Sequence, residues 1–184
     1  LSKPDIIIKD NKNKLDISNK QVSLSLNELS LKDSILNVKN IALQNNKLLF
    51  KDLKNHQNIF TQKIDINLDT FTQNKDTLDI KKITLSIPKI NYKDTKNKIS
   101  VFTKKSDILI SNIKKVAEKI SIYSVNLKNP SVYFNDKKNR LTVVSNGIKF
   151  NTQNFNINNS KVSIKKTNFK TKNVKFVDKK NKLD

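Results

Sequence analysis

The residues of this chain that could do chemistry recur in a fixed order: an Asp, an Asn three residues later, and then a basic residue. The Asp residues are Asp10, Asp52, Asp94, Asp136 and Asp178, and the Asn residues are Asn13, Asn55, Asn97, Asn139 and Asn181. A calcium loop needs three or more closely spaced oxygen ligands and a Gly at its sharp turn, whereas each segment here offers one carboxylate flanked by Lys. The spacing favours a hairpin turn instead. In that turn Asp accepts hydrogen bonds from backbone N–H groups two or three residues on, and Asn adopts the left-handed conformation.

The composition argues against an enzyme. His56 is the only histidine, and it occupies the position that Lys14, Lys98, Arg140 and Lys182 fill in the other segments. The chain has one Gly and no Cys, which excludes a glycine-rich phosphate loop, a thiolate metal site and a Cys nucleophile within these residues. The Asp residues come one to a turn and are not paired for acid–base work. We therefore predict no catalytic residue, no cofactor and no metal.

The turns belong to a repeat of 42 residues that aligns the whole chain without gaps. Its three prolines, Pro4, Pro88 and Pro130, fall in one column of the repeat (positions 4, 46, 88 and 130), and Asn46 fills the remaining place. We predict a single array and a fragment of a longer protein. Its units are residues 1–35 (partial), 36–77, 78–119, 120–161 and 162–184 (partial).

The apolar columns predict strands, because their spacing within each run is two. Each unit should hold about four short strands, at 78–86, 88–94, 98–104 and 106–113 in the clearest copy, which gives about sixteen in all. The Pro column marks a break between two strands or a kink in one. A doubled polar step in 78–85 and 120–127 predicts a β-bulge there. The segment Ser111–Ile120 is interpreted as a linker or loop.

The fold class is therefore all-β: a repetitive antiparallel sheet with one apolar face and no helical layer to cover it. Either the sheet curls into an elongated, U-shaped groove, or each unit forms a coil of a β-solenoid with a filled core. Under the groove hypothesis the lining residues are Leu78, Ile80, Leu85, Ile90, Tyr92, Val101, Ile108, Ile120, Ile122, Leu127, Val132, Phe134, Val143 and Phe150.

One stretch carries a resemblance to a known family. The segment "ISIYSVNLKNPSVYFNDKKNRL" (Ile120–Leu141), with apolar alternation, a Pro, a second alternation and then Asp and Asn-x-apolar, resembles the recurring element of the AsmA-like family. The segment "LDIKKITLSIPKINYKDTKNKI" (Leu78–Ile99) repeats it. This bacterial envelope family includes the TamB and YhdP proteins. Its element usually has Asp-Gly in the turn, whereas here Lys follows Asp136 and Thr follows Asp94.

The resemblance implies a non-enzymatic lipid conduit. In that family a U-shaped sheet, anchored in the inner membrane, crosses the periplasm and carries phospholipid acyl chains toward the outer membrane, which supports outer-membrane integrity. For this chain it implies phospholipids as partners, a periplasmic location and a membrane anchor outside the fragment. Acyl chains need only non-directional apolar contact, which alternating Ile, Leu, Val and Phe provide.

The net charge of +21 leaves two other classes open. A basic repeat scaffold could bind nucleic acid. Against this, Arg140 is the only Arg, Trp is absent, and the aromatics are expected on the apolar face rather than among the lysines, so no nucleic-acid partner is expected. The array could also be a structural or surface spacer. The lysines themselves could attract anionic headgroups, or only keep exposed sheet edges from aggregating.

Overall fold

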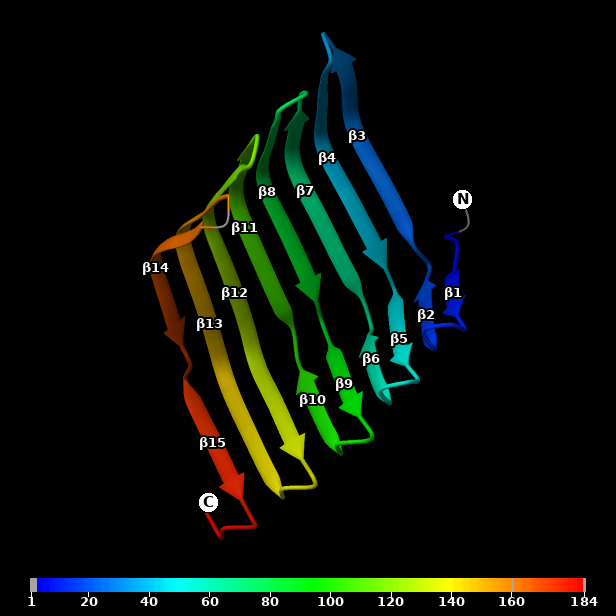
Figure 1. Ribbon diagram of the computed structural model, residues 1–184, viewed down its shortest axis with the longest axis vertical. Helices are drawn as coiled ribbons and strands as arrows, with labels where there is room; N and C mark the ends of the chain where they lie inside the picture. The colour runs from blue at the N-terminus through cyan, green and yellow to red at the C-terminus, as the bar shows by residue number, and fades with distance from the viewer. Residues whose placement is uncertain (1–2, 160, 184) are drawn as a thin grey trace.

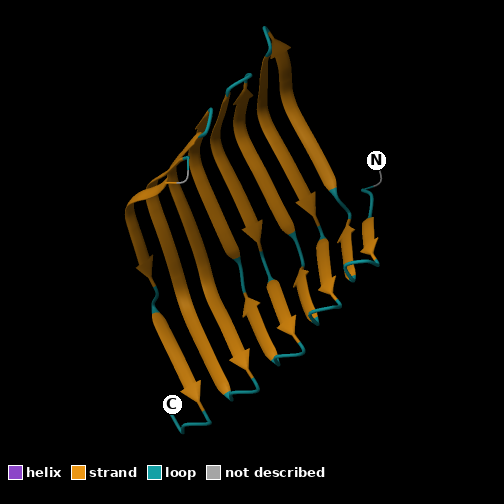
Figure 2. Ribbon diagram, viewed as in Figure 1, coloured by secondary structure: helices purple, strands orange, loops and turns teal. Residues whose placement is uncertain are grey.

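The computed structural model describes residues 3–159 and 161–183, and the regular elements in that part of the chain are all β-strands (Figure 2). Leu1 and Asp184, the outer limits of the two predicted partial units, lie outside the described residues. The described strands form one antiparallel sheet of 15 strands. Their bounds are β1 (Ile6–Asp10), β2 (Leu15–Lys20), β3 (Ser23–Lys32), β4 (Ile35–Asn45), β5 (Lys47–Asp52), β6 (Gln57–Thr61), β7 (Ile64–Gln73), β8 (Thr77–Ile87), β9 (Ile90–Asp94), β10 (Ile99–Thr103), β11 (Ser106–Val116), β12 (Lys119–Asp136), β13 (Leu141–Asn158), β14 (Lys161–Lys170) and β15 (Asn173–Asp178).

Most of these strands lie end to end in pairs, and each pair forms one long strand that runs from the lower to the upper end of the sheet (Figure 1). The predicted strands at 78–86, 88–94, 98–104 and 106–113 correspond to β8, β9, β10 and β11, although β11 continues to Val116. The described chain has 15 strands, close to the predicted number of about sixteen, and β12 and β13 run unbroken for 18 residues each. The break predicted at the Pro column is present at Pro88, which separates β8 from β9, whereas Pro130 lies within the continuous strand β12.

One register runs through the entire sheet. Leu24 pairs with Leu43, which also pairs with Ile66, which in turn pairs with Leu85. Residues 42 apart in the sequence therefore lie two strands apart on one straight row, perpendicular to the strands. The repeat unit is thus two neighbouring long strands with their two turns, and each column of the repeat becomes a row across the sheet.

The long strands bend near their upper ends. Glu28, Thr70, Asn112 and Asn154, one in each copy of the repeat, have φ between 50° and 55°. The predicted bulge is wrong: Asp69 pairs with Lys82 and Phe71 with Ile80, so neither strand gains a residue over the other. Both strands turn together at this row. The left-handed residues Thr70 and Asn112 lie on β7 and β11, and the doubled polar steps of β8 and β12 face them in the same row, so the alternation of faces is reset on both partners.

The apolar side chains lie on the inside of this bend. Val38 and Ile80, which flank the bend row, are 4% and 8% exposed and are the buried hydrophobic residues of the described chain. Side chains converge on the inside of a bend and diverge on its outside, so their burial places the apolar face on the concave side.

A second break, at mid-strand, is held by polar side chains. Asn45 Nδ2 donates to Asn19 Oδ1 (2.5 Å), and Asn45 Oδ1 accepts from the backbone N–H of Ile64 (2.9 Å). The hydroxyls of Ser145 and Thr171 hydrogen-bond at 2.9 Å across the same break. These contacts link the upper strand segments to the lower ones. The same face of the sheet therefore continues from one segment to the next across the break.

Gly147 lies at this break, and its contribution to the stability of the sheet can be tested. It has φ +66°, and an added Cβ would lie 2.6 Å from Lys172 Cγ. We expect Gly147→Ala to lower the free energy of unfolding by about 1–2 kcal/mol, because the left-handed conformation is unfavourable for a residue with a Cβ. Lys105→Ala, in the same column of the repeat, is the control and should change it by less than about 0.5 kcal/mol. Equal urea midpoints for the two variants would contradict the assigned backbone conformation.

The segment Ser111–Ile120 is not a linker. It forms the end of β11, a turn at Ala117 and Glu118, and the start of β12. The bend at Asn112 spaces Ile110 and Ile113 three apart although both belong to one strand, which hides the alternation. Among the described residues no helix is long and apolar enough to span a membrane.

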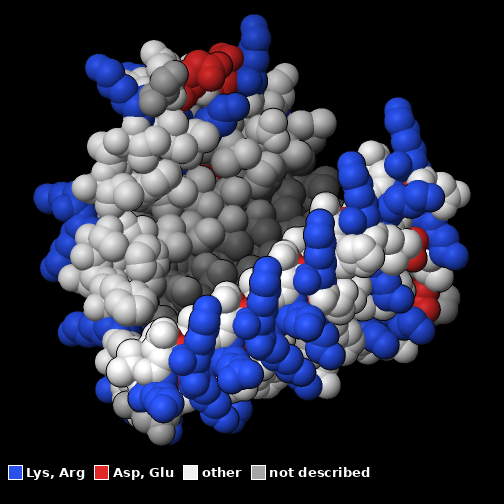
Figure 3. Space-filling model, turned by 60° about the horizontal axis from the view of Figure 1, so that its bottom comes forward, with Lys and Arg blue, Asp and Glu red and all other residues white. Residues whose placement is uncertain are grey.

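The sheet stays open, and the solenoid alternative is wrong for the described chain. A filled solenoid would bury many large apolar side chains, yet Val38 and Ile80 are the buried ones here. The sheet curls weakly around a hollow, whose depth shows no Lys or Arg in Figure 3. The fold is therefore the predicted all-β groove.

Candidate functional site: an apolar trough with a basic rim

The hollow is lined by one face of the sheet, which we call the trough face. Along the long strand β8–β9 it consists of Leu78, Ile80, Ile83, Leu85, Ile87, Ile90, Tyr92 and Asp94, and on every other strand it consists of the residues paired with them in the same rows. The residues between them, on the outer face, are Asp79, Lys82, Thr84, Ser86, Lys89, Asn91 and Lys93. Of all the residues in the trough-face rows, only Lys115 is basic. Polarity thus separates the two faces.

The predicted lining residues fall into continuous rows on this face. Leu85, Ile108, Leu127 and Phe150 follow one another through successive pairings in the upper segment. Tyr92, Val101, Phe134 and Val143 do the same in the lower segment. Along their own row across the sheet, Ile90 and Val132 alternate with small polar residues. The remaining predicted residues lie at or above the bend: Leu78, Ile80, Ile120 and Ile122. All 14 are half-buried except Ile80, which is buried.

The two rows extend well beyond the predicted residues. The first begins at Leu24 and ends at Phe169, and every member between them is apolar. The second runs from Ile8 to Phe176, with aromatic and β-branched residues in alternation over most of its length. Aromatic–β-branched pairs are favourable cross-strand neighbours. An apolar track therefore crosses the full width of the sheet.

The prediction missed other members of the same face. Ile83, Ile110 and Val125 pair in one row, and Ile113 and Phe155 belong to the row of Ile80 and Ile122. The sequence could have identified them, because an apolar residue recurs at each of these positions with the 42-residue period. They were missed because the bend changes the spacing of trough-face residues from two to three between Ile80 and Ile83, which interrupts the strand pattern.

The Asp-x-x-Asn turns form the lower rim of the trough, defined by residues 10–14, 52–56, 94–98, 136–140 and 178–182. In each turn the Asn backbone N–H donates to Asp Oδ1 and the Asn amide donates to Asp Oδ2; in the copy at Asp94 both distances are 2.8 Å. The sequence analysis predicted the hydrogen bonds that Asp accepts from backbone N–H groups. It did not predict the bond that the Asn side-chain amide donates to Asp. Hydrogen bonds from the Asn, first from its backbone N–H, lower the pKa of Asp10, Asp52, Asp94 and Asp136 below the ordinary 3.8. The pKa of Asp178 is lowered first by the Asn181 side chain.

The left-handed residue of each turn is the basic one, so its assignment to Asn was wrong. Lys14, His56, Lys98, Arg140 and Lys182 have φ between 57° and 59°. The fourth residue of a four-residue hairpin loop closes the turn, and the Asn before it is already held by Asp. His56 therefore sits in a structural turn position, as its column predicted.

The turns stack on one another along the rim. The backbone N–H of Leu53 donates to Lys14 O (2.9 Å), Thr95 N–H to His56 O (3.0 Å), Lys137 N–H to Lys98 O (3.1 Å) and Lys179 N–H to Arg140 O (3.1 Å). The sheet ladder thus continues through the loops and fixes their side chains in rows. In the described residues no group of three His, Cys, Asp or Glu is placed to hold a metal ion.

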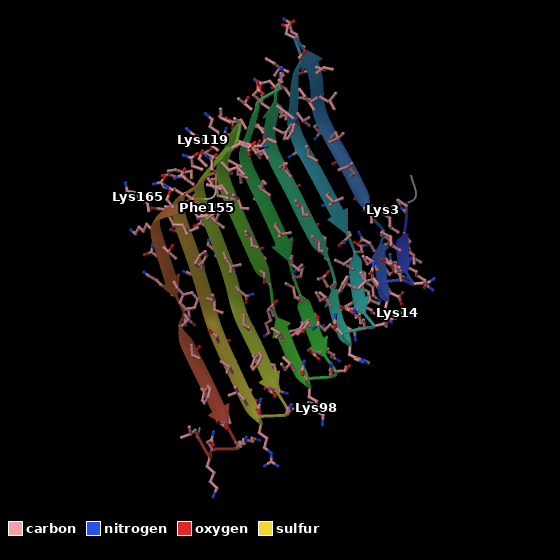
Figure 4. The ribbon with its side chains drawn as sticks, in the orientation of Figure 1. Lys3, Lys14, Lys98, Lys119, Phe155 and Lys165 are labelled. Carbon is pink, nitrogen blue, oxygen red and sulfur yellow. The ribbon has the colours of Figure 1, made fainter. Side chains whose placement is uncertain are left out.

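The lower rim is basic. Its third position is Lys in every copy: Lys12, Lys54, Lys96, Lys138 and Lys180. A row of Lys and Arg follows the near rim in Figure 3, and Figure 4 shows Lys14 and Lys98 at the tips of the lower turns. In the upper turns Asp33, Asp76 and Glu118 are each next to a lysine, so an acid and a base offset one another there, whereas most lower turns carry two or more basic residues for one Asp. The two rims of the trough therefore differ in charge.

The outer face holds aromatics that the sequence interpretation placed elsewhere. Phe60 and Phe102 lie on it, with Lys47 Nζ and Lys89 Nζ each 5.5 Å from the ring centre. Tyr133 pairs with Phe102 on the same face. The expectation that aromatics avoid the lysines is therefore wrong for these three. A shallow depression on this face, lined by Lys128, Lys149, Lys166 and Lys170 among others, has a volume of about 390 Å³.

Comparison of the chain with protein-family models, with curated proteins and with solved structures finds no match.

Proposed function

We propose that this chain is part of a non-enzymatic lipid conduit, in which phospholipid acyl chains lie in the trough and move along its rows. The observation that carries the proposal is the apolar track, unbroken from Leu24 to Phe169, on a face that nothing in the described chain covers. Acyl chains are recognised by apolar contact without directional bonds. A row of Leu, Ile and Phe offers such contact at every step, with no site that would hold a lipid in one place.

The resemblance to the AsmA-like family supports the same function and adds its setting. We propose a periplasmic location, between an inner membrane that holds the anchor and an outer membrane that receives the lipid. The open sheet supports this: a conduit needs an entrance and an exit, and a closed core would offer neither. The basic lower rim would lie beside the anionic headgroups of lipids in the trough, where each Lys contributes on the order of 1 kcal/mol.

The test is to purify the chain and identify bound lipid by mass spectrometry. We expect phospholipid with the wild-type chain and roughly tenfold less with Ile122→Asp, because a carboxylate in the track must be desolvated against the acyl chain. Tyr123→Asp is the matched control: it has the same charge change one residue on, at a side chain that is 56% exposed, and should keep the lipid. Ile80→Asp and Val132→Asp should act like Ile122→Asp. Asp94 and Asn97 substitutions should only weaken a turn.

A thermal melt separates the outcomes. If Ile122→Asp folds and keeps its lipid, the trough does not carry acyl chains. If wild type carries no lipid under conditions where its sheet is intact, the proposal is likewise wrong.

A second candidate is binding of nucleic acid on the outer face. The observation that favours it is the placement of Phe60 and Phe102 beneath lysines, since aromatic rings among basic residues are typical of single-strand binding. This function predicts retention on single-stranded DNA that falls steeply with salt. A chain with neither bound lipid nor such retention would be a spacer.

A further inference from the structure

A row of polar side chains crosses the trough face at the mid-strand break, between the two apolar tracks. We call it the polar belt, and its members share one column of the repeat: Asn19, Thr61, Thr103 and Ser145. In the sheet they alternate with apolar residues of the same row: Leu48, Ile90 and Val132. Between the two rims, no other column of the trough face is polar in every copy. The polar belt is therefore a regular feature of the repeat.

The first and last members of the polar belt have hydrogen-bond partners within the chain. Asn45 Nδ2 donates to Asn19 Oδ1 (2.5 Å). The hydroxyls of Ser145 and Thr171 hydrogen-bond at 2.9 Å. In both cases the partner lies 26 residues farther along the chain and occupies the same column of the repeat. A polar residue in that column thus completes the belt.

The two middle members, Thr61 and Thr103, lack such a partner. The residue 26 positions after Thr61 is Ile87, whose side chain has no polar atom. The residue 26 positions after Thr103 is Asn129, which is already engaged: its Nδ2 donates to Ser106 Oγ (2.6 Å), and its Oδ1 accepts from a backbone N–H (2.9 Å). The Oγ1 atoms of Thr61 and Thr103 are buried and have no hydrogen-bond partner among the described residues.

These two hydroxyls lower the stability of the sheet, because each gives up its hydrogen bond to water and gains none in return. Thr61 is 4% exposed, and Thr103 is half-buried. A Val at either position would have nearly the same shape without this cost. Few native structures keep a buried polar group unpaired unless it has another role. The two Thr residues therefore indicate a ligand that supplies the missing acceptor.

We propose that Thr61 and Thr103 donate hydrogen bonds to the ester carbonyl groups of a phospholipid whose acyl chains lie in the trough. This inference rests on the proposed lipid function and names the part of the lipid that is recognised besides its tails. The neighbours of both residues in the row are apolar, and the depth of the hollow shows no Lys or Arg (Figure 3). A phosphate would find no opposite charge there, whereas an ester carbonyl is a neutral acceptor joined directly to the acyl chain.

The geometry allows the polar belt to orient a lipid without holding it at one place. Rotation about χ1 exchanges the positions of the Thr hydroxyl and methyl groups, so Oγ1 can turn either into the sheet or toward the trough. Thr61 and Thr103 lie two strands apart in the row, which corresponds to about 10 Å. A carbonyl that leaves one hydroxyl therefore meets an equivalent donor one repeat farther on.

Ester-linked and ether-linked phospholipids test the proposal, because the ether form lacks the carbonyl acceptor. Delipidated chain is incubated with vesicles that contain equal amounts of dioleoyl phosphatidylglycerol and its dioleyl ether analogue, and the bound lipid is measured by mass spectrometry. Wild type should hold the ester form in roughly threefold to tenfold excess. Thr61→Val/Thr103→Val should hold the two forms in equal amounts. Thr84→Val, the same substitution on the outer face of β8, is the control and should keep the preference.

The outcomes separate this proposal from the lipid conduit itself. If wild type binds both lipids equally, the hydroxyls do not recognise the ester, while the conduit stands. If wild type binds neither lipid, both proposals are wrong. A preference for the ester that persists in Thr61→Val/Thr103→Val would also refute the role of these two residues.

Urea unfolding of the lipid-free chain gives a second measurement. Thr61→Val/Thr103→Val should have a higher urea midpoint than wild type, because it removes two buried hydroxyls that lack partners. Thr152→Val is the contrast, since Thr152 is 6% exposed and its hydroxyl donates to Lys166 O (3.1 Å). That variant should have a lower midpoint. If the double variant unfolded at less urea than wild type, the two hydroxyls would already be paired within the chain, and the proposal would fail.

Discussion

Replacing Ile80 by Asp should lower the free energy of unfolding by about 3 kcal/mol or more, the largest loss expected from one substitution in this chain. Ile80 is 8% exposed and pairs with Phe71 on one side and Ile113 on the other. A carboxylate there must give up its hydration among apolar side chains on the inside of the bend, with no partner to replace the water. The measurement is urea unfolding followed by circular dichroism.

The matched control is Lys81→Asp, one residue along, on an exposed side chain. It should change the free energy of unfolding by less than about 0.5 kcal/mol. Because it removes a Lys from a chain of net charge +21, it reduces repulsion rather than adding to it. If Lys81→Asp were as destabilising as Ile80→Asp, or if both were neutral, the trough face would be assigned to the wrong side of the sheet.

The strand bounds could be predicted because the repeat makes every column visible several times. The alternation through Leu78, Ile80 and then Leu85 recurs at Ile120, Ile122 and Leu127, so a single ambiguous copy does not decide the prediction. The Asp-x-x-Asn turn was equally accessible, since its hydrogen bonds are local and depend on two side chains three residues apart.

The errors about the linker, the bulge and the left-handed residue of the turns share one physical cause, which is the left-handed backbone. Asn112 has φ 50° inside β11 and spaces Ile110 and Ile113 as a helix would, which made Ser111–Ile120 look like a linker. Glycine normally marks such positions, but this chain has only one Gly, so the bends fall on Glu, Thr and Asn, and the turns on Lys, His and Arg. Without glycine, sequence alone gives no local mark for them.

The trough could be predicted as an apolar face, but its curvature could not. The long strands turn at the bend row, and most of them, β12 and β13 excepted, are also interrupted at mid-strand, as at the contact of Asn45 with Asn19. Asn45 and Asn19 are 26 residues apart, and their contact depends on the register of the sheet rather than on local pattern.

Acid should destabilise the sheet through the Asp residues of its lower rim. The pKa values of Asp10, Asp52, Asp94, Asp136 and Asp178 are lowered in the folded chain by hydrogen bonds from the paired Asn. Above about pH 5 these carboxyls are ionised in both the folded and the unfolded chain, so they give stability no pH dependence. Below about pH 4 the unfolded chain takes up protons first, and stability falls until the folded carboxyls are protonated as well.

Removing the Asn partners should flatten this acid response. In an Asn97→Ala/Asn139→Ala variant, Asp94 and Asp136 lose both of their Asn hydrogen bonds, so their pKa values return toward the ordinary 3.8. The variant should be less stable than wild type at neutral pH, but it should lose less stability between pH 5 and pH 2.5. Urea midpoints at both pH values, measured at high salt to screen the general repulsion of a basic chain, give the comparison. An acid response as steep as that of wild type would mean that repulsion among the lysines, and not the stacked Asp-x-x-Asn turns, limits the stability of the sheet in acid.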